Sequence, residues 1–114
     1  KMVVLPEYHT AYISITDEEL KRFGHRKGDT EGFVNVPFSV KGVKFSVLFV
    51  EKKDRIKVSF RSRGDFPVNR IASEHYQGGG HLNAAGGDSF QKMEDTLNHF
   101  ESLLPAYEAL SSDI

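Results

Sequence analysis

Residues 44–61 hold two strand patterns separated by a short polar turn, and this pair constrains the fold more than any other stretch. Residues 44–50 carry apolar side chains at both odd and even positions, which is typical of a strand covered on both faces. Between residues 55 and 61 apolar and polar side chains alternate, so one face meets a core. With a turn at residues 52–54, the pattern predicts a hairpin with the first strand central in a sheet. The side chains opposite the core in the second strand are those of Lys57, Ser59 and Arg61.

The N-terminal part predicts a strand and then a short helix. Residues 8–15 alternate with a period of two and contain good strand formers. Thr16 is followed three residues later by Glu19, the spacing of a reciprocal helix cap. With Gly24 as a stop signal, a helix is expected over residues 17–23.

A second short helix is expected between Asp29 or Thr30, either of which can cap it, and Val36. Pro37 should stop its last turn because proline disfavours a helical conformation in the residue before it. The apolar side chains that this helix should bury are those of Phe33, Val34 and Val36.

Two further helices are predicted in the C-terminal half, and the whole pattern indicates an α/β fold. Asp65 can cap the first of them, and Gly78 should end it. Pro105 should kink or restart the second, because proline removes a backbone hydrogen bond from a helix. The periodic faces consist of Val68, Ile71, Ala72 and His75 in the first helix, and of Met93, Leu97, Phe100, Leu104 and Tyr107 in the second.

Length and composition indicate one domain over residues 1–114, without a linker or repeat inside it. The chain has no cysteine, which excludes thiol catalysis, cysteine zinc sites and disulfides and is compatible with the cytoplasm. Polar residues interrupt the first 16 positions and no apolar run reaches 18 residues, so we expect neither export nor membrane spanning. The chain starts at Lys1 with Met second, as expected of a fragment of a longer protein or an expression remnant.

Charge is unevenly distributed although the formal net charge is only −1. Residues 41–70 hold nine basic side chains against three acids, whereas residues 88–114 hold one lysine against six acids. The near-zero total argues against a generic basic nucleic-acid-binding protein. The middle segment is therefore either a solvated basic face or the location of an anion site.

Residues 77–87 contain five of the ten glycines, a density that requires a physical reason. Glycines allow close backbone approach to a ligand and can direct several N–H groups at one anion. If His81 or Asn83 opens a short helical run over residues 82–85, its N-terminus would point at the same anion. The alternative is that the glycines only end the preceding helix. The spacing matches neither a P-loop nor a dinucleotide-binding motif.

A phosphate clamp follows if the chain returns after the hairpin so that His81 lies near Arg61. Arginine offers a planar fork of donors for phosphate oxygens, and histidine can donate a hydrogen bond or a proton. The clamp requires the backbone amides of residues 78–81 and the Arg61 guanidinium to face one anion. It would be excluded if the two elements lay on separate sides of the molecule.

The sequence resembles the C-terminal DHHA1 domain of the DHH/DHHA1 phosphoesterases, especially the nano-RNase/pAp phosphatase branch. The resemblance extends over nearly all of residues 10–100. Its most specific part is the GGGHLNAAGG segment, which follows the strand end VSFRSR and the helix start VNRIA at the family's order and spacing. The upstream segments GFVN and VKFS are also similar to the family. The resemblance implies a mixed sheet flanked by helices, with the Gly-rich loop between helices.

For this chain the resemblance implies a set of substrate-binding residues. Arg61 should hold a phosphate, with Ser62 in support and Arg63 as a second cation. The glycines should donate backbone N–H groups, while His81 should contact the phosphate and face the metal centre across a cleft, where it can assist catalysis. Asn83 either contacts sugar or phosphate or caps a helix; Arg70 is expected in solvent and Phe66 in the core. The implied set is Arg61, Ser62, Arg63, Gly78, Gly79, Gly80, His81 and Asn83.

The resemblance further implies a role beside a separate catalytic domain. The family's N-terminal DHH domain carries two divalent ions, usually manganese, whereas the five histidines of this chain form no Asp-His-His cluster. This domain is therefore expected to bind no cofactor itself and no membrane. Its expected partners are a short oligoribonucleotide or pAp, the DHH domain of the same parent chain and, in a homodimer, a second copy of the chain.

Two alternatives belong to other classes. One is a free-standing RNA-binding module akin to the related domain of alanyl-tRNA synthetases, and the other is an interaction domain whose glycines only stop a helix. Cyclic-dinucleotide phosphodiesterases and exopolyphosphatases also contain this domain type, so the residues leave the substrate open. Alone, the chain is not expected to turn over substrate.

Overall fold

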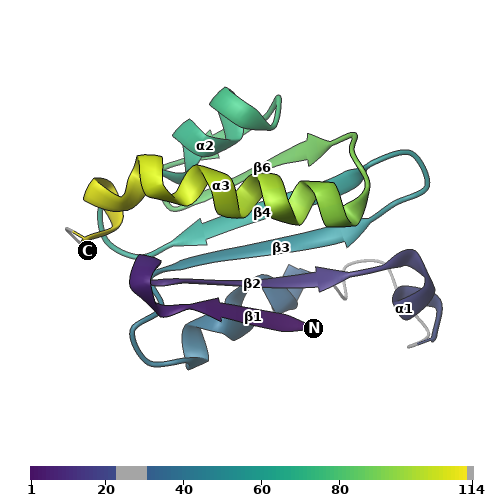
Figure 1. Cartoon of the computed structure of the whole chain (residues 1–114), viewed down its shortest axis with the longest axis horizontal. Coiled ribbons are helices and arrows are strands. Elements are labelled where there is room, and N and C mark those ends of the chain that lie inside the picture. Colours follow the sequence, from purple (N-terminus) through teal and green to yellow (C-terminus); the bar gives the residue numbers. More distant parts are fainter. Residues whose placement is uncertain (23–30, 113–114) are drawn as a thin grey trace.

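The computed structural model describes residues 1–22 and 31–112, which build a mixed six-stranded sheet flanked by helices (Figure 1). The sheet order is β1-β2-β3-β4-β6-β5; β2 and β3 are parallel, and every other neighbouring pair is antiparallel. The expected α/β fold with a mixed sheet and flanking helices is confirmed. The elements are β1 (Met2–Leu5), η1 (Pro6–Tyr8), β2 (Thr10–Ile15), α1 (Asp17–Arg22), η2 (Glu31–Ser39), β3 (Phe45–Glu51), β4 (Ile56–Ser62), α2 (Val68–His75), β5 (Gly79–His81), β6 (Ala84–Ser89) and α3 (Met93–Ser112).

The two faces of the sheet are covered by different elements. Helices α2 and α3 lie across one face, and the 3₁₀ helix η2 lies behind the β1 to β3 part of the other (Figure 1). The larger core, under α2 and α3, includes Phe45, Phe60 and Phe100. A smaller core, between the sheet, α1 and η2, includes Val34 and Leu48. Because η2 does not extend along the whole sheet, part of the second face remains open.

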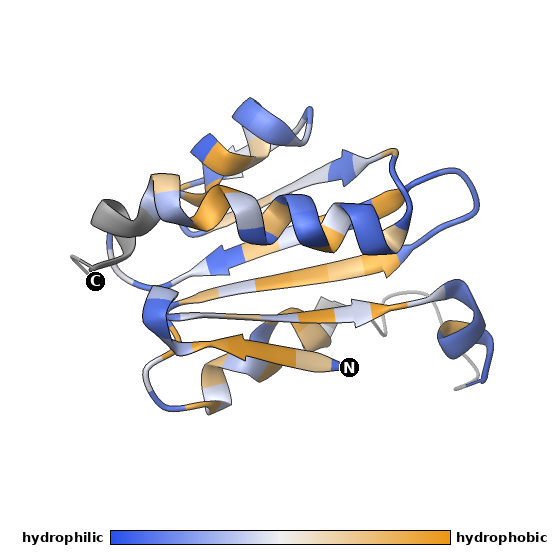
Figure 2. Cartoon of the chain, in the orientation of Figure 1, coloured by the Kyte–Doolittle hydropathy of each residue, from blue (hydrophilic) through white to orange (hydrophobic). Residues whose placement is uncertain are grey.

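The predicted hairpin is present with the expected faces. Strand β3 is apolar on both sides, and in Figure 2 it is the most continuously hydrophobic strand of the sheet centre. In β4 the residues Ile56, Val58 and Phe60 are buried, and their pairing with β3 fixes the register. The predicted strand over residues 8–15 begins at Thr10, because Pro6–Tyr8 forms a 3₁₀ turn that ends in the left-handed conformation of His9 (φ 53°).

The predicted cap of α1 is confirmed. The backbone N–H of Thr16 donates to the Glu19 carboxylate (2.8 Å), and the Glu19 N–H donates to the Thr16 hydroxyl (3.1 Å). This hydrogen bond from the Thr16 backbone holds the pKa of Glu19 below its usual value. Phe23, Gly24, Asp29 and Thr30 lie outside the described residues.

The segment after them forms the expected short helix as a 3₁₀ helix, but the helix continues to Ser39, so Pro37 lies inside it and does not end it. The expectation that Phe33, Val34 and Val36 are all buried is wrong for two of them. Phe33 is 43% exposed and Val36 is 45% exposed, whereas Val34 is 1% exposed. In a 3₁₀ helix side chains three residues apart share one edge, so Phe33 and Val36 face outward together while Val34 packs on the sheet.

The helices of the second half begin and end differently from the prediction. Asp65 does not cap α2: Pro67 occupies the N-cap position, and the Val68 N–H donates to the Leu82 carbonyl (2.9 Å). Gly78 lies beyond the helix, which ends at His75, and its N–H donates back to the Ala72 carbonyl (3.0 Å). Helix α3 continues through Pro105 without restarting. No helix in the described ranges has the length and apolar character needed to cross a membrane.

The glycine-rich segment forms strands, so the expected loop with a short helix over residues 82–85 is wrong. Gly79–His81 is β5 and Ala84–Ser89 is β6, and β6 pairs along β4. A sheet edge at β4 would leave unpaired backbone groups, and β6 satisfies them. The strand pairing therefore overrides the local preference of this sequence for a loop.

Candidate anion-binding site

Strand β4 presents a polar row on the sheet face opposite to the larger core. Lys57, Ser59 and Arg61 alternate with the buried residues of this strand, as the sequence predicts. On β6, Gly86 pairs with Ser59 and Ala84 pairs with Arg61. Paired residues of antiparallel strands share a face, so small residues lie beside the polar row.

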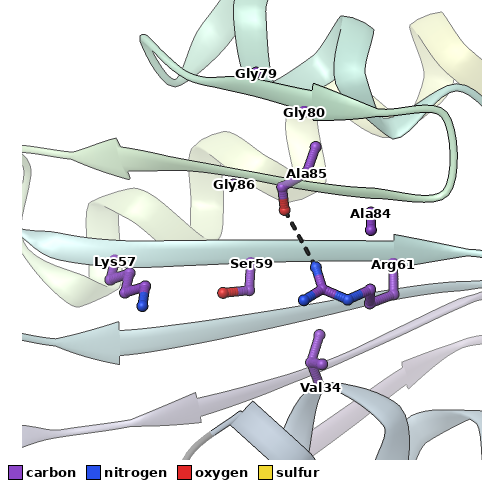
Figure 3. Close-up of a pocket in the computed structure, with 9 residues that line it drawn as sticks. All are labelled: Val34, Lys57, Ser59, Arg61, Gly79, Gly80, Ala84, Ala85 and Gly86. Atoms are coloured by element: carbon purple, nitrogen blue, oxygen red, sulfur yellow. Dashed lines mark hydrogen bonds between the residues drawn. The ribbon is translucent and has the colours of Figure 1, made fainter. Parts of the chain in front are cut away.

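These small residues leave a hollow of about 370 Å³ over β4, β6 and β5 (Figure 3). The Arg61 side chain lies in it and leans back along β4 in the figure. Glycine and alanine supply most of the remaining lining, so the ligand would meet backbone rather than long side chains. The lining residues are Val34, Lys57, Ser59, Arg61, Gly79, Gly80, Ala84, Ala85 and Gly86.

Arg61 is held by backbone carbonyl groups and not by an acid. Its Nη1 donates to the carbonyl oxygens of Phe60 (2.8 Å) and Ala85 (3.4 Å). Among the described residues, no carboxylate forms an ion pair with it. The guanidinium is therefore oriented while its other N–H groups can bind an anion.

The structure places part of the glycine segment beside Arg61, as the clamp requires. Gly79 and Gly80 line the same hollow as Arg61. A Cβ on Gly79 would have no heavy atom within 4 Å, so this glycine faces open space. Gly78 and Gly80 are required instead by packing, because no Cβ fits at either position. A Cβ would lie 1.9 Å from the Gly86 oxygen at position 78 and 2.6 Å from the Ala84 oxygen at position 80.

The expected backbone nest is not formed as a turn at a helix N-terminus. The Gly78 N–H donates to the Ala72 carbonyl, and residues 79–81 are extended in β5. Within residues 77–87, only Gln77 (φ 52°) and Gly80 (φ 147°) have positive φ. Any backbone donors for an anion would therefore come from the edge strand β5.

His81 lies on the same sheet face as Arg61 but outside the lining of the hollow. It is exposed and pairs with Ala84, which in turn pairs with Arg61. Two strand spacings of about 4.8 Å each separate the His81 and Arg61 backbones. The histidine therefore stands beside the hollow, where a ligand larger than one phosphate could reach it.

Ser62 and Asn83 tie the loop between β4 and α2 to the β5–β6 turn. The Ser62 side chain is buried on the face opposite to Arg61, and its hydroxyl donates to the Phe66 carbonyl (2.7 Å). The Asn83 amide donates to the Ser62 hydroxyl and to the Gly64 carbonyl, both at 2.9 Å. These contacts position the hairpin, and Asn83 caps no helix.

The remaining residues considered from the sequence lie outside the hollow. The Arg63 guanidinium stacks 4.5 Å from the centroid of the Phe38 ring. Phe66 is 1% exposed and belongs to the core, as expected. Arg70 is about half exposed and lies 3.8 Å from the Glu74 carboxylate.

Lys57 and Ser59 were not among the site residues predicted from the sequence. The signal was available, because the alternation of β4 places both on the face of Arg61. Further along this face, Arg55 Nε donates to Asp88 (2.8 Å), and its Nη1 donates to Asp54 (3.0 Å). The hydrogen bond to Asp88 raises the pKa of Arg55. The Arg55 guanidinium is thus engaged with two carboxylates of the same chain.

Comparison with known families gives one match that extends over most of the chain, the DHHA1 domain, over residues 7–108. The chain belongs to the DHHA1 family. This confirms the resemblance drawn from the VSFRSR strand end and the GGGHLNAAGG segment.

Three relatives of this DHHA1 domain are informative. The bifunctional oligoribonuclease and PAP phosphatase NrnA of Bacillus subtilis is 32% identical over 108 residues, 93% of this chain and 34% of that protein. An exopolyphosphatase-related protein from Bacteroides fragilis has 48% identity and a TM-score of 0.93, covering 97% of this chain and 33% of that one. The pGpG-specific phosphodiesterase PggH from Vibrio cholerae shares the fold (TM-score 0.65, 17% identity, 95% and 35% covered). The chain thus spans about a third of the length of each.

The side chains of the described part of the chain do not fit a divalent metal centre. Among the side chains that the structure describes, no three histidines, aspartates or glutamates gather closely enough to hold an ion. Arg61 and its surroundings have the donors to bind and orient an anion.

Proposed function

We propose that this DHHA1 domain binds the phosphate end of a short oligoribonucleotide or of pAp and presents it to a catalytic domain of the same parent protein. The observation that carries the proposal is that Arg61 and the open Gly79 line one hollow. Membership of the DHHA1 family and the similarity to NrnA support the nucleotide class of ligand.

The chemistry of the hollow suits a phosphate ester. A guanidinium can donate two parallel hydrogen bonds to two phosphate oxygens, and backbone contacts already orient that of Arg61. The glycine at position 79 lets a ligand approach the edge strand without meeting a side chain. In this proposal Gly80 and His81 contribute contacts along β5. The strand is positioned by Ser62, Asn83 and Gly78. Arg63 is a more distant cation.

The reaction itself would take place on another domain. The relatives are about three times as long as this chain, which leaves room for an N-terminal DHH domain. In the proposal that domain holds two divalent ions, manganese in the first instance, which activate water for phosphoester hydrolysis. The cytoplasm remains the compartment expected from the absence of cysteine.

Binding of ligands of different length tests the proposal. We would titrate the chain with pAp, a 5′-phosphorylated dinucleotide and a long single-stranded RNA at 50 and 200 mM salt. A clamp for one terminal phosphate predicts binding of the two short ligands with a shallow salt dependence. Strong binding of the long RNA with a steep salt dependence, and no response to pAp, would instead support an RNA-binding module and reject the proposal.

Substitution at the centre of the hollow completes this test. Arg61→Ala should weaken binding of the short ligands by at least about tenfold, whereas Lys92→Met, which removes one exposed positive charge elsewhere, should leave it unchanged. Equal binding by wild type and Arg61→Ala would show that the ligand lies elsewhere.

A further inference from the structure

The alternation of β4, continued by one residue at each end, places four positively charged residues on the face of Arg61, and two of them contact other side chains. The four are Arg55, Lys57, Arg61 and Arg63. Arg55 is hydrogen-bonded to Asp88 and Asp54, and Arg63 lies over the Phe38 ring. Within residues 1–22 and 31–112, Lys57 and Arg61 have no carboxylate partner. The uncompensated positive charge of the hollow therefore comes from this pair.

The two free cations flank one small polar residue. Lys57, Ser59 and Arg61 occupy alternating positions of β4, and all three line the hollow. Figure 3 shows the Ser59 hydroxyl between the ammonium group of Lys57 and the guanidinium of Arg61. An anion placed at Ser59 would therefore meet a cation on each side.

The floor beside Ser59 has room for such an anion. Ser59 pairs with Gly86, and Gly86 pairs with Gly79, so this row of three strands carries no side chain larger than that of serine. The acid nearest to Ser59 in the strand register of this face is Asp88, which pairs with Lys57 in the next row. Its carboxylate accepts the Arg55 Nε–H, which offsets its negative charge.

We propose that Lys57 supplies the second positive charge of the hollow and makes it selective for a terminal phosphomonoester over an internal phosphodiester. The inference rests on the proposed function and adds the charge state of the ligand. A phosphomonoester carries close to two negative charges at neutral pH, whereas a diester carries one. Arg61 alone balances a diester, and Lys57 with Arg61 balances a monoester. The lysine is a specificity-determining residue of the same site.

A pair of ligands that differ by one charge tests this selectivity. We would measure the Kd of AMP and of adenosine 5′-(methyl phosphate) at pH 7.5 for the wild type, Lys57→Met, Lys57→Arg and Lys92→Met. The wild type should bind AMP at least about tenfold more tightly than the methyl ester. Lys57→Met should reduce that ratio to within about twofold and change the Kd of the methyl ester by less than about threefold. Lys57→Arg should retain the ratio, and Lys92→Met should match the wild type.

The outcomes separate this inference from the proposed function. If the wild type binds both ligands and Lys57→Met leaves the ratio unchanged, Lys57 has no role in selectivity and the inference is wrong while the proposed function stands. A wild type that binds neither ligand rejects the inference, and the titration with pAp then decides the proposed function. Because Lys57 is exposed, Lys57→Met should keep the wild-type amide NMR spectrum apart from residues near the hollow.

Discussion

The side-chain amide of Asn83 donates a hydrogen bond of 2.9 Å to the Ser62 hydroxyl, and the Ser62 N–H donates to the Asn83 carbonyl (3.0 Å). These contacts join the end of β4 to the β5–β6 turn across 21 positions of sequence. The turn is thereby fixed beside the strand that carries Arg61. The position of the glycine strand over the hollow depends on this junction.

Ser62→Ala should destabilise the fold because it removes the buried hydroxyl that makes the side-chain hydrogen bonds of this junction. The Phe66 carbonyl would lose its donor, and the loss should cost about 1–3 kcal/mol in the free energy of unfolding by urea. Ser73→Ala, at an exposed hydroxyl of α2, should change the stability by less than about 0.5 kcal/mol. Equal effects of the two substitutions would contradict the assigned role of the junction.

Arg61→Ala should weaken binding of pAp by about 10- to 150-fold, which corresponds to loss of charged hydrogen bonds worth about 1.5–3 kcal/mol. Arg61→Lys should recover only part of the affinity, because an ammonium group cannot form the two parallel hydrogen bonds of a guanidinium. Isothermal titration calorimetry measures both. Full affinity in the lysine variant would show that only charge matters at this position.

Gly79→Ala separates binding from folding, because a Cβ at this position meets open space in the hollow. We expect unchanged stability, within about 0.5 kcal/mol, and at least about fivefold weaker phosphate binding. Gly78→Ala should instead destabilise the fold by about 3 kcal/mol or more, since its Cβ would overlap the Gly86 carbonyl. Gly32→Ala, also in open space but not in the lining of the hollow, is the control for both readouts. Normal binding by Gly79→Ala would remove β5 from the site.

Thr16→Ala should cost helix α1 about 1 kcal/mol, because the reciprocal cap with Glu19 is lost. Amide hydrogen exchange at Leu20, whose N–H donates to the Thr16 carbonyl, measures the local loss, and Thr16→Ser should retain protection.

The pKa of Glu19 is lowered in the folded state, so the contribution of Glu19 to stability is complete above its unfolded pKa and is lost as pH falls through the folded value. The NMR chemical shifts of α1 should change with pH as Glu19 titrates. In Glu19→Gln this pH-dependent change should be absent.

Tyr107→Phe should reduce the sensitivity of the fold to alkaline pH. Burial, and then the hydrogen bond to Glu74 (2.5 Å), raise the pKa of the Tyr107 hydroxyl from 10.0 to about 12. The stabilisation is complete below pH 10 and is lost as pH rises toward 12, because the unfolded chain ionises first. Urea unfolding at pH 8 to 11.5 should show a smaller decline in the variant. Tyr12 and Tyr76, whose pKa values are also raised, account for the decline that remains.

The periodic segments could be predicted from the sequence, whereas segments controlled by long-range pairing could not. The faces of β3 and β4 and the cap of α1 depend on residues within a few positions of one another, so local pattern was sufficient. Strand β1 pairs with β2, and the chain was not expected to contain it. Residues 77–87 were expected to form a loop because glycine has a low intrinsic strand propensity, yet pairing of β6 with β4 and of β5 with β6 makes residues 79–81 and 84–89 strands.

The candidate site divides in the same way. Arg61 and the glycine segment were selected from the sequence and lie together, whereas Ser62, Arg63 and Asn83 were selected with them but contact other parts of the chain. Strand alternation placed Lys57 and Ser59 on the face of Arg61, but only the tertiary structure showed that both line one hollow with it.

The sequence by itself determined which side chains of β4 face away from the core, because alternation along a strand follows from backbone geometry alone. It also carried the linked motifs by which the family is recognised. Only the tertiary structure decided which cations remain free and which glycines face open space. Those properties depend on contacts between residues far apart in the chain, and no local pattern of residues encodes them.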